Sequence, residues 1–161
     1  MVEYIQIMPE TSAVKPITKP PYPYLGSLAV GIIMHFIMPF AIFGRFWVGL
    51  VIGLPLVCVG ALLIIWAVRT LRAEHVDPRF KPVETIVSGG PFHFTRNPMY
   101  LAFTLIYAGI ALSVNAIWPL ALLPFLLGIM HYGVIRREER YLETRFGEEY
   151  RAYRSRVRRW I

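Results

Sequence analysis

The residue types best suited to chemistry in this sequence gather at two places, and the first is the stretch that begins at Asn97. Asn97 can cap a helix with its side-chain oxygen, and Pro98 at the first helical position loses no hydrogen bond. Along the helix expected from there, Tyr100, Thr104 and Tyr107 share one face. Polar groups on one face of an otherwise apolar membrane helix usually point at protein or at a cavity. This face is therefore a candidate for the functional site.

The second place is the adjacent pair Glu138 and Glu139, where a long apolar stretch ends. His131 precedes them by about two helical turns, which places it on a similar side of the helix. If the two apolar helices form a hairpin, Arg96 and Tyr100 face this pair. Carboxylates accept hydrogen bonds from ribose hydroxyls or an amino group, and aromatic rings stack on a base or bind a cation. The spacing permits such a ligand pocket, and it equally permits an Arg–Glu ion-pair network that holds the hairpin together.

A short run of residues before the first place ends in two glycines. The run Glu84 to Val87 favours an extended backbone, and Gly89-Gly90 follows after one serine. Glycines allow the backbone to approach a ligand closely, and they also allow a simple tight turn. The residues alone leave both interpretations open.

The composition indicates a membrane protein of about one domain. Of the 161 residues, 56% are hydrophobic, and the mean hydropathy is +0.50. This is too apolar for an ordinary soluble domain, and the apolar residues occur in long blocks. The single cysteine, Cys58, excludes an intrachain disulfide and a C-x-x-C metal site. The histidines are scattered, so we expect no metal site.

The apolar blocks predict an all-α, polytopic membrane fold with about four transmembrane helices. The expected spans are residues 25–43, 46–68, 98–113 and 117–135. The first two spans are joined only by Gly44-Arg45, so we expect a tight antiparallel hairpin. Residues 1–24 are expected to form an extended arm before a single domain at 25–161. Within that domain, residues 69–97 form a loop and residues 136–161 a charged tail.

The basic residues are distributed on one side of the expected membrane topology. Of seventeen Lys and Arg residues, only Arg45 lies between the first two apolar blocks. This asymmetry is the positive-inside pattern, and it places both termini and the loop 69–97 in the cytoplasm. It accounts for the net charge of +7 without a nucleic-acid partner. A chain of this size without a signal peptide is expected in a prokaryotic inner membrane.

Beyond residue 135 the fourth helix is expected to leave the membrane and to stop at Gly147, which is a typical helix C-terminus. A second short helix is then expected from Glu148 to about Val157. Its apolar face carries Tyr150, Tyr153, Val157 and Trp160. The other, solvated face is supplied by Arg151, Arg154, Arg158 and Arg159. The pattern predicts an amphipathic interfacial helix on the membrane surface.

Two motifs in this order resemble the isoprenylcysteine carboxyl methyltransferase and phospholipid methyltransferase family. They read Gly-Pro-Phe-x-Phe-x-Arg-Asn-Pro-x-Tyr and, about forty residues later, Glu-Glu-Arg-Tyr-Leu-x-x-x-Phe-Gly-x-x-Tyr-x-x-Tyr. The similarity covers roughly residues 70–161. It implies an integral-membrane enzyme that uses S-adenosylmethionine to methylate a lipophilic acceptor.

The resemblance also implies a set of cofactor-binding residues, with Asn97 where many family members have histidine. The cofactor-binding candidates are Thr85, Ile86, Val87, Gly90, Phe92, Asn97, Pro98, Tyr100 and Glu138. From position and residue type we add Arg96 to orient an anionic group and Glu139 to accept a proton, both as catalytic candidates. The substrate-binding candidates are Tyr107, His131 and Arg137.

The methyl acceptor stays open between a prenylcysteine-like carboxylate and a phospholipid amine. Val134 stands where the prenylcysteine enzymes have the arginine that holds the substrate carboxylate, and Arg136 or Arg137 on the next turn is the available substitute. The implied mechanism is a direct in-line transfer that depends on alignment and exclusion of water. Two alternatives are an NADPH-dependent sterol-type reductase and a non-enzymatic helical membrane module with a basic lipid-binding tail. The sequence says nothing about oligomeric state.

Overall fold

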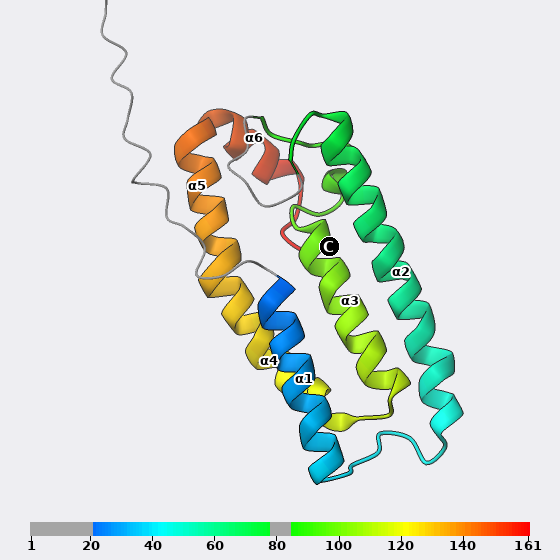
Figure 1. Ribbon diagram of the computed structural model, residues 1–161. Coiled ribbons are helices and arrows are strands. Elements are labelled where there is room, and N and C mark those ends of the chain that lie inside the picture. The colour runs from blue at the N-terminus through cyan, green and yellow to red at the C-terminus, as the bar shows by residue number, and fades with distance from the viewer. Residues whose placement is uncertain (1–20, 78–84) are drawn as a thin grey trace, which may run out of the picture.

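The computed structural model describes residues 21–77 and 85–161, and every regular element in these residues is a helix (Figure 1). The helices are α1 (Pro21–Ile37), α2 (Phe46–Ala73), α3 (Pro98–Ser113), α4 (Ile117–Met130), α5 (Arg136–Phe146) and α6 (Glu148–Arg156). A short 3-10 helix, η2 (Gly90–His93), precedes α3, and a π-helical turn, η3 (His131–Ile135), joins α4 to α5. The predicted all-α class is confirmed for the described residues.

Helices α2 and α3 pack antiparallel along most of their length, and glycines bring their backbones together. A Cβ atom added at Gly60 would lie 2.8 Å from the Ala102 carbonyl oxygen and 2.7 Å from Ile106 Cγ1. One added at Gly109 would lie 2.7 Å from the Gly53 carbonyl oxygen. Small residues at such positions allow close van der Waals contact between membrane helices. This pair of helices therefore forms the rigid support on which the start of α3 is held.

Helix α1 lies against α4 and α3 and does not form the predicted hairpin with α2 (Figure 1). The predicted span 25–43 and the tight turn at Gly44-Arg45 were wrong. Helix α1 ends at Ile37, because Pro39 disfavours a helical conformation of the residue before it. Residues 38–45 form a longer connection that runs past α3 to α2.

This connection is fastened to the turn between α3 and α4 by Asn115. The side-chain oxygen of Asn115 accepts hydrogen bonds from the backbone nitrogens of Ile42, at 2.9 Å, and Phe43, at 2.8 Å. Its side-chain nitrogen donates to the carbonyl oxygen of Phe43, at 2.9 Å. The backbone N–H and C=O groups of this non-helical connection are thus hydrogen-bonded at this end of the bundle.

Two other predicted helices agree more closely with the structure. The predicted helix 98–113 is confirmed, and α2 begins at the predicted residue 46 but extends to Ala73 instead of 68. The predicted loop 69–97 therefore begins with the last turn of α2. Helix α1 begins at Pro21, inside the predicted arm 1–24, and the rest of the arm lies outside the described residues. The division into an arm and a single domain stays a prediction.

Within the part of the chain that the structure describes, two helices are long and apolar enough to cross a membrane by length and composition: α2 and the continuous helix Ile117–Phe146. Helices α1 and α3 are apolar but shorter, with 17 and 16 residues. In the continuous helix the apolar part is the predicted span 117–135. Helix α5, in which seven of 11 residues are charged, extends beyond that span and ends at Gly147 as predicted.

Helix α6 folds back against the protein. Tyr150 and Tyr153 are 1% and 6% exposed and form a buried cluster with Val157, against which Ile86 and Leu142 pack. The prediction that this apolar face lies on the membrane surface was wrong, because helical periodicity does not distinguish a lipid partner from a protein partner. The consequence is that α6 covers the loop before η2 and the start of α3.

Candidate functional site

The first turn of α3 meets α5 at a partly buried hydrogen bond. The hydroxyl group of Tyr100 donates to Oε1 of Glu138 at 2.7 Å, and Tyr100 is 4% exposed. Next to it, Nη1 of Arg96 lies 3.2 Å from Oε1 of Glu139. These contacts confirm the predicted meeting of the two corners of the hairpin. They also confirm that an Arg–Glu ion pair is part of it.

Glu138 lies beyond the apolar span, and its environment is unusual for a carboxyl group. Burial raises the pKa of Glu138 to about 7. The hydrogen bond from Tyr100 opposes this rise, and the nearby charge of Glu139 adds to it. A carboxyl group with a pKa near neutrality exchanges a proton at the pH at which the protein works.

Glu139 is held by a second arginine that the sequence did not single out. Arg159 donates to Glu139 through Nε at 2.9 Å and through Nη2 at 2.7 Å, and this hydrogen bonding raises the pKa of Arg159. Arg96 also donates from Nη1 to the hydroxyl oxygen of Tyr150 at 3.4 Å. We assigned Arg159 to a solvated face, because no sequence spacing links it to a glutamate on another helix.

Arg96 has one donor left over. Its side chain is 9% exposed, and within the described residues its buried Nε atom has no hydrogen-bond partner. Two guanidinium groups, Arg96 and Arg159, surround one carboxylate, Glu139, so the cluster carries one net positive charge. An unpaired buried donor is costly in a folded protein, and a ligand that accepts from it removes this cost.

The segment after α6 crosses the beginning of α3 and is bound to it through its backbone. The carbonyl oxygen of Arg158 accepts from the backbone nitrogen of Arg96 at 2.9 Å. The carbonyl oxygen of Arg159 accepts from Asn97 Nδ2 at 2.9 Å and from Thr95 Oγ1 at 3.1 Å. The expected side-chain cap by Asn97 was therefore wrong, because this amide binds the distant chain segment instead.

The loop before η2 is packed between α2 and α6. Val87 is buried with Leu71 of α2, and the carbonyl oxygen of Phe92 accepts a hydrogen bond from the Tyr153 hydroxyl at 2.8 Å. Burial raises the pKa of Tyr153, so its hydroxyl remains a donor. Gly90 has a φ of +54°, and a Cβ atom there would collide with Thr70.

The remaining cofactor candidates differ in exposure. Ile86 packs on the cluster of α6, Pro98 is buried, and Thr85 is exposed. Glu84 lies outside the described residues.

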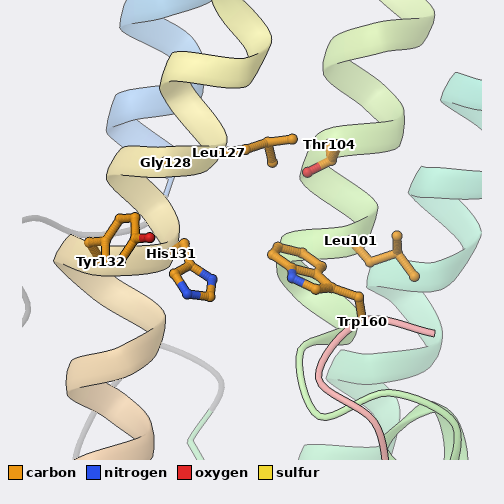
Figure 2. A pocket seen from close by; sticks show the side chains of 7 residues that line it. All are labelled: Leu101, Thr104, Leu127, Gly128, His131, Tyr132 and Trp160. Carbon is orange, nitrogen blue, oxygen red and sulfur yellow. The ribbon is translucent and has the colours of Figure 1, made fainter.

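An apolar cavity of about 550 Å³ opens between α3 and the helix α4–η3 (Figure 2). Its wall on α3 includes Leu101, the residue after Tyr100, and Thr104, whose hydroxyl donates to the Tyr100 carbonyl oxygen at 2.8 Å. Its walls are Leu101 and Thr104 of α3, Leu127 and Gly128 of α4, and His131 and Tyr132 of η3. Trp160 completes the lining from the segment after α6. The volume is in the range of about 300–1,000 Å³ that is typical of small-molecule sites.

The three substrate candidates are not brought together. His131 lines the cavity, and its imidazole ring faces the Trp160 indole in Figure 2. Tyr107 is 2% exposed, donates to the Pro119 carbonyl oxygen at 2.8 Å and is hydrogen-bonded to Ser27, so it lies outside the lining. Arg137 is on α5, also outside the lining. Sequence reasoning missed Trp160 as a cavity residue, since its apolar side chain was assigned to the membrane-facing side of the last helix.

Three comparisons relate this chain to known proteins. A family model described as "Phospholipid methyltransferase" matches residues 48–149, which is more than half of the chain. An uncharacterized protein of Haemophilus influenzae is 44% identical over 64 residues, which cover 39% of this chain and 100% of that protein. No solved structure matches the chain.

Proposed function

The chain belongs to the phospholipid methyltransferase family, and on this premise we propose that it methylates the amino group of a membrane lipid. Family membership makes it a membrane enzyme that uses S-adenosylmethionine, and it decides against the reductase and the non-enzymatic alternatives. The observation that carries the finer proposal is the Tyr100–Glu138 hydrogen bond together with an apolar cavity whose wall on α3 includes Leu101 and Thr104, the neighbours of Tyr100. A lipid chain in that cavity leaves its head group near this pair.

The donor set near Glu138 fits the cofactor. When bound, S-adenosylmethionine supplies a methyl group activated by a sulfonium centre. Its amino group suits the Glu138 carboxylate, and its carboxylate group suits the unpartnered Nε atom of Arg96. We propose that the loop Thr85–Val87, with Gly90, Phe92, Asn97 and Pro98, encloses the rest of the cofactor. The support for this is their position between α2 and α6 next to Arg96.

An amine acceptor is favoured over a carboxylate by two features. Val134, which replaces the substrate-binding arginine of the prenylcysteine enzymes, is completely buried, so no cation is presented at that position. Methylation of an amine releases a proton, and Glu138 has a pKa near the pH at which such a proton must be accepted. The cavity wall also carries polar groups of Thr104, His131 and Tyr132 that can contact a head group.

The two carboxylates then have different roles. We expected Glu139 to accept the proton, but both of its oxygens are bound by guanidinium groups. As a proposal, Glu139 holds Arg96 in place to orient an anionic group, and Glu138 is the proton acceptor. The protein supplies alignment and exclusion of water for a direct in-line transfer, and no covalent enzyme intermediate is needed.

We further propose that all four apolar helices span the membrane, with both ends of the chain and the site in the cytoplasm. The support is the one-sided distribution of arginine, which is concentrated in α5, α6 and the segment that follows. The net positive cluster of Arg96, Glu139 and Arg159 suits the phosphate group of a phospholipid at that surface.

The first test is cofactor binding by calorimetry on the full chain in nanodiscs. Wild-type protein is expected to bind S-adenosylmethionine, and Glu138→Ala is expected to abolish binding. Glu149→Ala, which removes an exposed glutamate of α6, is the matched control and should bind normally. Binding that survives Glu138→Ala contradicts the proposed cofactor site.

The second test identifies the acceptor with methyl-labelled cofactor. Phosphatidylethanolamine should become labelled, and a farnesylcysteine analogue should not. Label found only on the farnesylcysteine analogue would overturn the amine proposal and leave the family assignment intact.

A further inference from the structure

A second, smaller cavity lies next to the first one. Its volume is about 260 Å³, and it is lined by Leu63 and Trp66 of α2, by Phe94 near η2 and by Ile161. It shares two lining residues with the cavity of about 550 Å³, namely Leu101 and Trp160. These two side chains therefore stand where the cavities adjoin.

Trp160 is fixed at this position by the segment that carries it. The carbonyl oxygens of Arg158 and Arg159 are bound to the start of α3, and the Arg159 side chain is bound to Glu139. The indole also packs against the buried cluster that contains Tyr100. In Figure 2 the indole lies between His131 and Leu101, at the side of the larger cavity. A side chain that directly follows an anchored segment and packs on a buried cluster can act as a wall.

Both cavities suit hydrocarbon. In the larger one the side chains with polar atoms are Thr104, His131, Tyr132 and Trp160, and in the smaller one, among its described lining residues, they are Thr95 and the indoles of Trp66 and Trp160. On α3 the larger cavity is lined by Leu101 and by Thr104, which is hydrogen-bonded to the Tyr100 carbonyl oxygen, whereas the smaller one extends toward Leu63 and Trp66 of α2. By size alone, the smaller cavity is below the usual range of about 300–1,000 Å³ for a separate ligand site. If the side chains between them are removed, the smaller cavity can lengthen the larger one.

We propose that Trp160 is a specificity-determining residue that confines the hydrocarbon chain of the acceptor to the larger cavity and so limits its length. This inference rests on the proposed function, because it takes the acceptor to be a lipid whose chain lies beside Tyr100. Replacement of the indole by a small side chain joins the two cavities. Each further methylene group that becomes buried then tightens binding by about fourfold.

The test measures binding of single-chain lysophosphatidylethanolamines with short, medium and long saturated chains to the full chain in detergent, by calorimetry. Wild-type protein should reach its highest affinity at an intermediate length. Trp160→Ala should shift the optimum to a longer chain, with Trp160→Phe between the two. S-adenosylmethionine affinity is measured alongside and should stay unchanged, which reports an intact fold and cofactor site.

Two further variants keep the result interpretable. Trp47→Ala removes a tryptophan that is 56% exposed at the opposite end of α2, and it should leave the length preference unchanged. Leu101→Ala thins the same wall from α3 and should shift the optimum in the same direction as Trp160→Ala. If Trp160→Ala does not fold, Leu101→Ala and Trp160→Phe decide the question.

An unchanged length preference in folded wall variants overturns the inference, as does a wild-type protein that binds none of these lipids. The methylation assay separates the two proposals. If the optimum shifts but no lysolipid is methylated, the acceptor assignment fails and the role of Trp160 stands. If methylation occurs with the same preference in all variants, the acceptor stands and the role of Trp160 fails.

Discussion

The hydroxyl group of Tyr100, on the first turn of α3, lies 2.7 Å from Oε1 of Glu138, which is 38 residues further along the chain. This hydrogen bond joins the start of one apolar helix to the charged extension of another. Because the carboxyl group is largely removed from water there, its charged form is disfavoured and its pKa rises to about 7. The following predictions begin from this pair.

We expect the rate of methyl transfer to rise with pH through about 7, since Glu138 must lose its proton before it can accept one from the acceptor. Measured at S-adenosylmethionine concentrations that saturate each protein, which separates proton transfer from cofactor binding, Glu138→Gln should lower kcat by roughly 10²- to 10⁴-fold and remove this step from the pH profile. The variant's remaining pH dependence reports the ionisation of the acceptor amine, and it serves as the control. An identical step near pH 7 in wild type and variant would exclude Glu138 as the titrating group.

The same carboxyl group makes stability depend on pH. Its pKa is about 7 in the folded protein and 4.5 in its ordinary state, so the folded protein binds the proton more tightly. The contribution to stability is complete below pH 4.5 and is lost as the pH rises through 7, by about 3 kcal/mol in the limit. The thermal unfolding midpoint in detergent should fall over this range in wild type and fall less in Glu138→Gln. Parallel curves would contradict the assignment.

Arg159→Ala should destabilise the protein by about 1–3 kcal/mol, because it removes two hydrogen bonds from a buried carboxylate. The backbone hydrogen bonds of residue 159 remain, so the segment should stay in place. Arg159→Lys retains the charge but loses the two-pronged geometry and should lie between wild type and Arg159→Ala. Arg151→Ala, which removes an exposed arginine of α6, is the control. Equal unfolding midpoints for all four proteins would show that Glu139 needs only Arg96.

At the opposite end of the bundle, Asn115→Ala should lower the free energy of unfolding by about 2–4 kcal/mol. The change removes the three hydrogen bonds to residues 42 and 43 and leaves alanine at a φ of +55°. Asn115→Gly tolerates that φ and isolates the loss of the hydrogen bonds. S-adenosylmethionine affinity, extrapolated to the folded protein, should be unaffected in both. A loss of affinity that exceeds the loss of stability would contradict a purely structural role.

Gly60→Ala should destabilise the contact of α2 with α3, because the added Cβ atom would lie within 2.7–2.8 Å of Ile106 and Ala102. Overpacking of this kind typically costs about 1–3 kcal/mol. Gly26→Ala on α1 is the matched control, since nothing lies within 4 Å of its added Cβ atom. The unfolding midpoint in detergent should fall for Gly60→Ala only. An equal effect of the two substitutions would indicate a general response of these helices to alanine.

Much of the fold and part of the site could be predicted from particular residues. Pro98 defines the start of α3, and Gly147 defines the end of α5, because backbone chemistry at helix ends is local. The resemblance carried by Gly-Pro-Phe and Glu-Glu-Arg-Tyr-Leu identified the family. Helical spacing then placed Tyr100 opposite Glu138, since a short turn between two helices forces them to be antiparallel.

The tertiary structure alone decided which partner each side chain takes. The apolar face of α6 bears Tyr150 and Tyr153, which bury equally well in lipid or in protein, so their periodicity could not reveal that they cover the loop before η2. The side chain of Asn97 can either cap its own helix or donate to a carbonyl oxygen elsewhere in the chain. It donates to the Arg159 carbonyl oxygen, because the segment after α6 crosses the start of α3. Arg159 and Trp160 acquire their positions from backbone hydrogen bonds to the start of α3, which link residues about sixty positions apart. Local patterns set the elements, whereas these long-range contacts depend on the packing of the whole bundle.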